Sequence, residues 1–375
     1  MHLNLINGAI GNAAVLLIIL ICAYLNSYNP EIYYRALQED ELLEWASFWA
    51  FFIAAIAFTF YAIRQYRKGI KLPWFSAALA LFCFVVAMEE ISWGQRLLGY
   101  RPPVYFLENN FQQELNIHNV FATDLRKLAL KVIIVGYGII LPLIALIPLI
   151  RLLLQRLGIF PTPIVLLPTF IAAYALYEIY PWKFSGELVE LILGLGFLFS
   201  SVLIIKISLD SRINNVWHCW LWIIAPTALV LLFGMLTTSI SRKQLTADPA
   251  VVDAAKTESQ ALLRDFTALA SGKYGFPISR CGYHVRIFKY SNKHDRKQKL
   301  KNGFFAKLQN QGLSKERAEF FLDPWNSPYW VRDDCLDDKK RRITVYSFGP
   351  DRSRQSLPTK LLGDDIGTEL VFKNR

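Results

Sequence analysis

Two adjacent glutamates, Glu89 and Glu90, lie at the end of a long apolar run in the stretch "AMEEISWGQR". A carboxylate inside hydrocarbon is costly, so we expect it to be neutral, paired or facing an aqueous cavity. If one helix continues through this stretch, Glu89 and Arg96 share a face, because residues i and i+7 are about two turns apart. We therefore expect a polar network containing Glu89 and Arg96, unless Gly94 ends the helix first.

A second pair of reactive side chains, Glu114 and His118, lies in the long segment that follows. Residues four apart share a face of a helix, and an acid and a histidine at this spacing can bind a metal ion. In that interpretation Glu89 or Glu90 is a general base or metal ligand, and His118 is the acid or second ligand. The alternative is an interfacial helix in which this spacing arises by chance.

Seven apolar runs, which must position these groups, reach or approach the roughly 20 residues that a helix needs to cross hydrocarbon. They cover residues 6–25, 42–63, 73–91, 128–150, 163–180, 188–205 and 216–240. The first run has neither a basic segment before it nor a small-residue cleavage site after it, so we interpret it as a span and not as a signal peptide. The fifth and sixth runs are short, and the alternative for them is a hairpin that does not fully cross.

Composition and charge divide the chain into two parts. It has 375 residues, 54% hydrophobic and 19% charged, which excludes an ordinary soluble protein. The net charge is +11, and the 26 basic and 16 acidic residues after Ile240 supply ten of these charges, since 26 − 16 is 10. We expect a multi-span membrane domain over residues 1–241 and a second domain over residues 242–375. A transporter is not favoured, because polar residues in mid-span are scarce.

Orientation follows from the loops, since lysine and arginine in short loops resist translocation. Four positive charges lie in "RQYRKGIK" after the second run, and two lie in "RLLLQR" after the fourth. With seven spans, these loops predict a protein of the bacterial inner membrane with a cytoplasmic N-terminus and a periplasmic or extracellular C-terminal domain, for which nucleic acid is not an expected partner. Five further acids then lie at helix ends on the outer side: Glu41, Glu44, Glu178, Glu187 and Glu190. Either they form a common site, or they lie there because helix ends near water tolerate glutamate.

The C-terminal domain has the pattern of an α+β fold. Asp248 and Pro249 are typical of a helix start, and the apolar residues that follow recur at helical spacing as far as Gly272. Two β-like runs, "YHVRIFKY" and "RRITVYSFG", lie on either side of a second helical segment, "KERAEFFL".

The five cysteines fall into two groups. Cys22, Cys83 and Cys219 lie inside apolar runs, where we expect them to pack as small apolar residues. Cys281 and Cys335 lie in the charged domain. If that domain is extracytoplasmic, we expect these two to form a disulfide that closes a loop of roughly 50 residues.

The stretches "FLDPWNSPYWVR", "ITVYSFGPD" and "GDDIGTEL" resemble the C-terminal part of the major pseudopilins of type II secretion systems. The resemblance implies an extracytoplasmic pseudopilin-like module with calcium in the loop between its last strands, where Asp351 and Asp365 match the family's ligands. Gly363 stands where another aspartate is expected, with Asp364 beside it. The alternative to calcium is a loop with ordinary surface carboxylates. Separately, "EEISWGQR" through "NIHN" resembles uncharacterised polytopic bacterial membrane proteins, a resemblance that implies no activity.

Two classes of function are compatible with these features. One is a membrane enzyme on a lipid or lipid-linked substrate, with a site containing Glu89, Glu90, Arg96, Glu114 and His118. The other is a non-enzymatic envelope assembly, receptor or secretion-associated protein in which these polar residues are structural. Besides membrane lipids, the basic run 286–301 predicts an anionic partner, either lipid headgroups or an acidic protein. The alternative is that this run is simply solvated.

Overall fold

The computed structural model describes the chain apart from residues 1, 39–40, 71–72, 111, 210–220, 244–247, 272–282, 292–306, 338–339, 358–359 and 374–375. The chain forms two compact units. The first contains residues 1–93 and 121–239, and the second contains residues 94–120 and 240–375. The segment 94–120, which lies within the predicted membrane domain of residues 1–241, thus belongs to the second unit.

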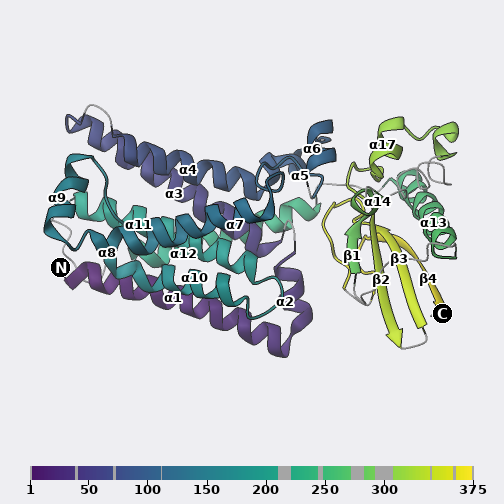
Figure 1. Cartoon of the computed structure of the whole chain (residues 1–375), viewed down its shortest axis with the longest axis horizontal. Coiled ribbons are helices and arrows are strands. Elements are labelled where there is room, and N and C mark those ends of the chain that lie inside the picture. Colours follow the sequence, from purple (N-terminus) through teal and green to yellow (C-terminus); the bar gives the residue numbers. More distant parts are fainter. Residues whose placement is uncertain are drawn as a thin grey trace. The chain divides into compact units, whose positions relative to one another are not determined.

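The first unit is helical, and each of the seven predicted apolar runs overlaps one of its helices (Figure 1). Its elements are α1 (His2–Tyr28), α2 (Pro30–Ala36), α3 (Leu42–Arg67), α4 (Trp74–Glu90), the 3-10 turn η1 (Ser92–Gly94), α7 (Thr123–Lys131), the π-helix η2 (Val132–Ile140), α8 (Leu141–Ile144), α9 (Pro148–Arg156), the 3-10 turn η3 (Ile164–Leu166), α10 (Leu167–Ile179), α11 (Ser185–Leu209) and α12 (Leu221–Lys243).

Among the described residues, five helical stretches are long and apolar enough to cross a membrane. They are Leu5–Tyr28, Leu42–Arg67, Asp124–Ile144, Ser185–Leu209 and Leu221–Ser241. The third predicted run forms α4, which has 17 residues, and the fifth forms α10, which has 13. Length and composition are therefore those of an integral membrane protein.

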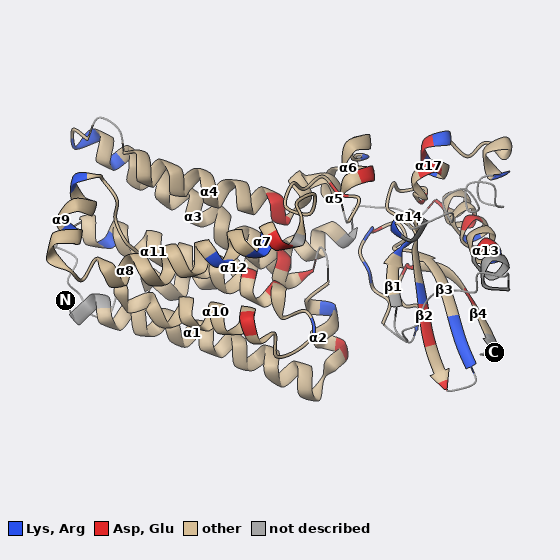
Figure 2. Ribbon diagram, in the orientation of Figure 1, with Lys and Arg blue, Asp and Glu red and all other residues tan. Residues whose placement is uncertain are grey.

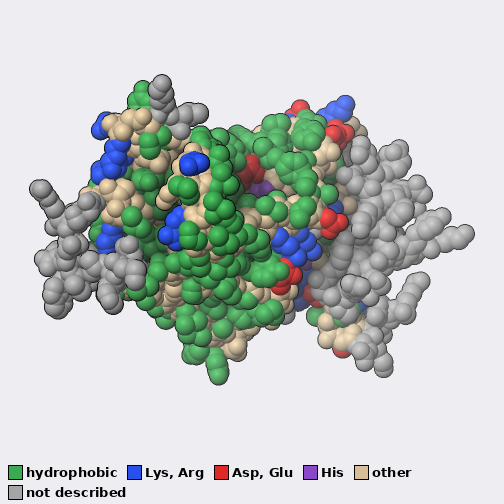
Figure 3. All heavy atoms as spheres, turned by 60° about the vertical axis from the view of Figure 1, so that its left-hand side comes forward, with side chains coloured by type: hydrophobic (Ala, Val, Ile, Leu, Met, Phe, Trp, Pro, Cys, Tyr) green, Lys and Arg blue, Asp and Glu red, His purple; other side chains and the backbone are tan. Residues whose placement is uncertain are grey.

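Helix α11 lies at the centre of the first unit. Glycines permit close approach to its neighbours: a Cβ on Gly194 would lie 3.0 Å from Cβ of Ala50 on α3, and one on Gly196 would lie 2.9 Å from the ring of Phe170 on α10. Small residues bring helices together in this way inside membranes. Large apolar side chains of the outer helices, such as Leu16, Leu17 and Leu20 of α1, are instead exposed, and Figure 3 shows hydrophobic side chains over much of the visible surface of this unit. A surface of this kind suits contact with lipid.

The second unit combines helices with one antiparallel sheet of strand order β1-β2-β3-β4. Its helical elements are α5 (Gln95–Leu98), α6 (Val104–Asn109), α13 (Pro249–Ser271), α14 (Ile287–Ser291), the 3-10 turn η5 (Leu308–Gln311) and α17 (Lys315–Phe320). Its strands are β1 (Tyr283–Arg286), β2 (Trp330–Asp337), β3 (Lys340–Ser347) and β4 (Ile366–Lys373). The mixture of helices and strands predicted for this part of the chain is therefore present.

Helix α13 packs along β3 and β4 and begins where the sequence predicted. The carboxylate of Asp248 accepts a hydrogen bond from the backbone N–H of Ala250 at 2.9 Å, which caps the helix. The main hydrophobic core contains Leu262 of α13, Val331 of β2 and Val345 of β3. It also contains Leu107 of α6, which is completely buried. Segment 94–120 thus contributes a core residue to the second unit.

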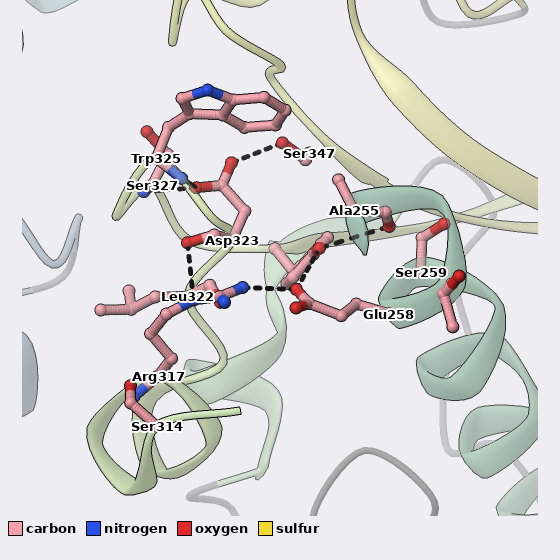
Figure 4. A network of polar contacts seen from close by, with 12 residues as sticks. Ala255, Glu258, Ser259, Ser314, Arg317, Leu322, Asp323, Trp325, Ser327 and Ser347 are labelled. Carbon is pink, nitrogen blue, oxygen red and sulfur yellow. Dashed lines mark hydrogen bonds and ion pairs between the residues drawn. The ribbon is translucent and has the colours of Figure 1, made fainter. Parts of the chain in front are cut away.

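A buried polar network supports the loop between α17 and β2, and Figure 4 shows it. Asp323 is completely buried, and one of its carboxylate oxygens accepts hydrogen bonds from the backbone N–H groups of Trp325 and Ser327 at 2.9 and 2.8 Å. Arg317 contacts both sides of the network, donating to the Asp323 carbonyl at 3.0 Å and to Glu258 of α13 at 2.5 Å. The Asp-Pro-Trp stretch therefore has a structural role here, since its aspartate satisfies the backbone of its own loop.

Candidate functional site

Glu89 lies at the end of α4, is buried, and accepts a hydrogen bond from the indole Nε1 of Trp93 at 2.7 Å. The helix ends at Glu90, and the next turn has three consecutive positive φ angles: 46° at Ser92, 55° at Trp93 and 77° at Gly94. Serine and tryptophan rarely adopt this conformation, so the surrounding contacts must hold the turn in place.

This turn overturns the prediction that Glu89 and Arg96 share one face of a continuous helix, and the stated alternative, in which the helix ends first, is the one observed. The helix ends before Gly94, and a separate short helix, α5, begins at Gln95. Spacing along an ideal helix therefore does not connect Glu89 with Arg96. The side chain of Arg96 lies outside the described residues, so its predicted pairing with Glu89 stays a prediction.

Glu90 belongs to an acidic cluster inside the first unit. Its carboxylate lies beside Ser47 of α3 and within electrostatic range of Glu187 and Glu190 of α11. Figure 2 shows acidic residues gathered toward one end of this unit, with the basic residues of α9 and of the turn between α3 and α4 at the other end. Of the other acids predicted on the outer side, Glu178 forms an ion pair with Lys131 at 2.5 Å.

Glu114 is buried in the second unit, where it faces an arginine distant in the sequence. Its Oε1 lies 3.4 Å from Nη2 of Arg286, and the exposed fractions of the Glu114 and Arg286 side chains are 7% and 3%. The second oxygen, Oε2, accepts from the Asn116 amide at 3.3 Å. The predicted helix that would align Glu114 with His118 is wrong, because residues 112–120 form turns and bends.

Amide side chains stabilise this irregular segment from within. Nδ2 of Asn110 donates to the carbonyl and to Oδ1 of Asn116 at 2.8 and 2.7 Å, and the backbone N–H of Leu115 donates to Oε1 of Gln95 at 2.6 Å. Nε2 of Gln113 donates to the carbonyl of Phe320 at 3.3 Å. A buried segment without regular structure needs partners for its backbone groups, and these amides provide them.

An aromatic stack holds Arg286 in place. Its guanidinium lies 4.3 Å from the ring centroid of Trp330, a cation–π geometry. The ring of His284 stacks on the same indole at 4.4 Å, while its Nε2 lies 2.7 Å from the hydroxyl of Tyr346. Nη1 of Arg354 donates to Nδ1 of His284 at 3.0 Å, so the proton of a neutral imidazole resides on Nε2.

The loop assigned to calcium by resemblance contains three neighbouring carboxylates, Asp351, Asp364 and Asp365. Burial is the main cause that raises the pKa of Asp351 and of Asp365 to about 7, and it also raises the pKa of Asp364. Backbone N–H groups occupy several of their oxygens: Ser353 donates to Asp351 at 2.8 Å, and Ser356 donates to Asp365 at 2.7 Å.

Oδ1 of Asp364 and Oδ1 of Asp365 are buried without a hydrogen-bond donor in the described part of the chain, a feature that suits a cation. Within that same part, however, no three His, Cys, Asp or Glu side chains are arranged around one metal position. Calcium at Asp351 and Asp365, and metal at Glu114 and His118, therefore stay predictions.

The remaining sequence predictions are placed only in part. Cys22 and Cys83 are buried free thiols, as expected, but Cys219 and Cys281 lie outside the described residues. The pairing of Cys281 with Cys335, a residue of β2, stays a prediction. Residues 292–301 of the basic run also lie outside the described residues, and Arg286 at its start is buried. The anionic partner of this run therefore stays a prediction.

Sequence reasoning missed Arg286 as the partner of Glu114. Arg286 follows Val285 in β1, and successive side chains of a strand point to opposite faces. The sequence therefore indicated that these two side chains lie on different faces of a strand. The partner of Arg286, Glu114, is 172 residues away in the sequence, so no local sequence pattern could predict the pair. Comparison of the chain with protein-family models, with curated proteins and with solved structures found no match.

Proposed function

We propose that this protein is a bacterial inner-membrane protein whose second unit is an extracytoplasmic binding module of a receptor, assembly or secretion-associated system. The observation that carries the proposal is the structural environment of Glu114. This candidate catalytic residue forms a buried pair with Arg286, next to amides that stabilise its own segment. A carboxylate in this position supports a fold and is poorly placed to act as a free base or metal ligand.

The architecture around the pair supports the same proposal. Segment 94–120 lies between two transmembrane parts of the chain in sequence, and its Leu107 is inside the core of the second unit. We propose seven spans, a cytoplasmic N-terminus and a pseudopilin-like second unit. The segment then ties an outer domain to the membrane helices at a second point besides the connection after α12.

A membrane enzyme on a lipid or lipid-linked substrate is the second candidate, and the acidic cluster favours it. Glu90, Glu187 and Glu190 come from two helices and lie within electrostatic range of each other. Carboxylates gathered near the end of a helical bundle can act as general bases or attract a cationic group. In this alternative the reaction centre is at Glu90, and the Glu114 pair remains structural.

The experiment that separates the two candidates compares Glu114→Gln with Glu90→Gln in the purified full-length protein. If Glu114 is structural, Glu114→Gln lowers the unfolding temperature of the second unit by several degrees. Active-site residues are often retained at a cost in stability, so replacement of a catalytic Glu114 would leave this temperature unchanged or raise it. The enzyme alternative is tested by the metal content of these two variants and of Glu89→Gln and His118→Ala. Loss of a stoichiometric metal without unfolding would contradict the binding-module proposal.

A further inference from the structure

Segment 94–120 of the second unit exposes a group of large apolar side chains. Four of them have exposed fractions between 47% and 77%: Leu98, Val104, Tyr105 and Ile117. The described residues that follow α12 expose only three, although that part of the chain is longer: Leu336, Leu370 and Val371. Single exposed apolar residues are common on any protein, but a concentration in one short segment marks a surface that contacts another apolar medium.

The fold of the second unit accounts for one side of α6 and leaves the other side unexplained. Leu107 is completely buried in the core of this unit. Val104 and Tyr105, in the first turn of the same helix, are instead exposed, as is Leu98 at the end of α5. These outer side chains gain nothing from the hydrophobic effect while they face water. Only an apolar partner outside the unit would bury them.

The chain connects this segment at both ends to apolar helices of the first unit. On one side, the 3-10 turn η1 and helix α5 form most of the backbone between Glu90 and Leu98, so these two residues are no more than about 20 Å apart. On the other side, the stretch Asp124–Ile144, which is long and apolar enough to cross a membrane, begins shortly after the segment ends. Leu125 and Leu128 at the start of this stretch are exposed as well. Exposed apolar side chains thus continue from the segment into a stretch that can contact lipid.

We infer that segment 94–120 docks on the membrane surface next to the end of α4, with Leu98, Val104 and Tyr105 at the boundary between lipid headgroups and acyl chains. Apolar side chains bind at that depth, and tyrosine is enriched there because its ring is apolar and its hydroxyl is polar. A protein partner is less favoured. The four exposed side chains offer at most about 600 Å², even if each were as large as a tryptophan, whereas a stable complex buries ~800 Å² on each partner. The inference rests on the proposal that the first unit spans the membrane.

The test is photo-crosslinking of the full-length protein in liposomes of phosphatidylethanolamine and phosphatidylglycerol. The photoreactive residue p-benzoylphenylalanine replaces Leu98 in one variant and Tyr105 in a second, since both positions are exposed and can accommodate the larger ring. After irradiation, mass spectrometry of the intact protein measures the fraction of chains that carry a lipid. We expect lipid adducts at both positions, with yields at least about tenfold above the control, because partitioning of one large apolar side chain favours lipid by about that factor.

The matched control is the same substitution at Leu336, which is exposed to a degree similar to that of Val104 but lies in β2, outside the segment. Leu17 of α1, exposed in a stretch that can cross a membrane, is the positive control for the first unit. Adducts at Leu17 without adducts at Leu98 and Tyr105, or equal yields at Leu336, would overturn the inference and leave the membrane proposal standing. Crosslinks between two protein chains in place of lipid adducts would overturn it in favour of self-association. Absence of lipid adducts even at Leu17 would overturn both the inference and the membrane proposal.

Discussion

Glu114 and Arg286 are 172 residues apart in the sequence and form a buried ion pair in the second unit, with Oε1 and Nη2 separated by 3.4 Å. The pair joins a segment that lies between α4 and α7 in the sequence to the first strand of the C-terminal sheet. The pair gives Glu114 a role in holding the second unit together. No group of three possible metal ligands is found among the described residues, so Glu114 is not part of such a group there. The energetic contribution of the pair can be measured directly.

A double-mutant cycle with Glu114→Gln and Arg286→Gln tests the pair. Each single substitution leaves a buried charge without its opposite, so each should lower the free energy of unfolding of the second unit by about 3 kcal/mol. The double variant should lose less than the sum of the two, with a coupling of about 1 kcal/mol or more. Denaturant unfolding followed by tryptophan fluorescence provides the measurement. Additive losses would show that the two side chains do not interact.

Leu107 tests whether segment 94–120 contributes to the hydrophobic core. Leu107→Ala should cost about 2–5 kcal/mol of unfolding free energy, because it opens a cavity at a fully buried position. The matched control is Leu98→Ala in the same segment, where the side chain is 77% exposed and the cost should be below about 0.5 kcal/mol. Similar losses for both variants would place Leu107 outside the core.

The pH dependence of stability should follow the buried aspartates. Burial raises the pKa of Asp323, Asp351 and Asp365 from 3.8 to about 7 in the folded protein. The folded state therefore binds protons more tightly than the unfolded state, and stability is lost as pH rises from about 4 through about 7. We expect a higher unfolding temperature of the second unit at pH 5.5 than at pH 8. Asp365→Asn should reduce this difference, and a temperature that rises with pH would contradict the assignment.

The orientation predicts which lysine positions are accessible from outside an intact cell. Lys315 of α17 and Lys68, which follows α3, are both exposed. With a cytoplasmic N-terminus, a membrane-impermeant thiol reagent should label Lys315→Cys and not Lys68→Cys, relative to the parent protein. After cell lysis it should label both. Labelling of Lys68→Cys alone in intact cells would reverse the orientation.

Sequence patterns predicted much of the fold because they are local. Apolar runs located the helices of the first unit, and Asp248 marked the start of α13. The helix expected through Glu89 and Arg96 failed because Ser92 and Trp93 adopt positive φ, which neither residue type favours. The helix expected through Glu114 and His118 failed because long-range contacts, such as the bond from Gln113 to Phe320, replace local ones.

The sequence indicated which acidic residues belong to the candidate site, but it did not indicate which residues they contact. Glu89, Glu90 and Glu114 were selected because carboxylates in apolar surroundings need compensation. Their partners, Trp93, Ser47 and Arg286, depend on how the chain turns and on which distant elements meet. Three-dimensional contact thus changed the interpretation of Glu114 from reactive group to structural ion pair.

Hydrogen–deuterium exchange of residues 104–120 in the full-length protein tests the central claim most directly. If this segment is an integral part of the second unit, its hydrogen-bonded amides, such as that of Asn110, should be as protected as those of β3. Arg286→Gln should weaken the protection of both together. Rapid exchange of the segment, as in an exposed loop, while β2 and β3 remain protected would contradict the account.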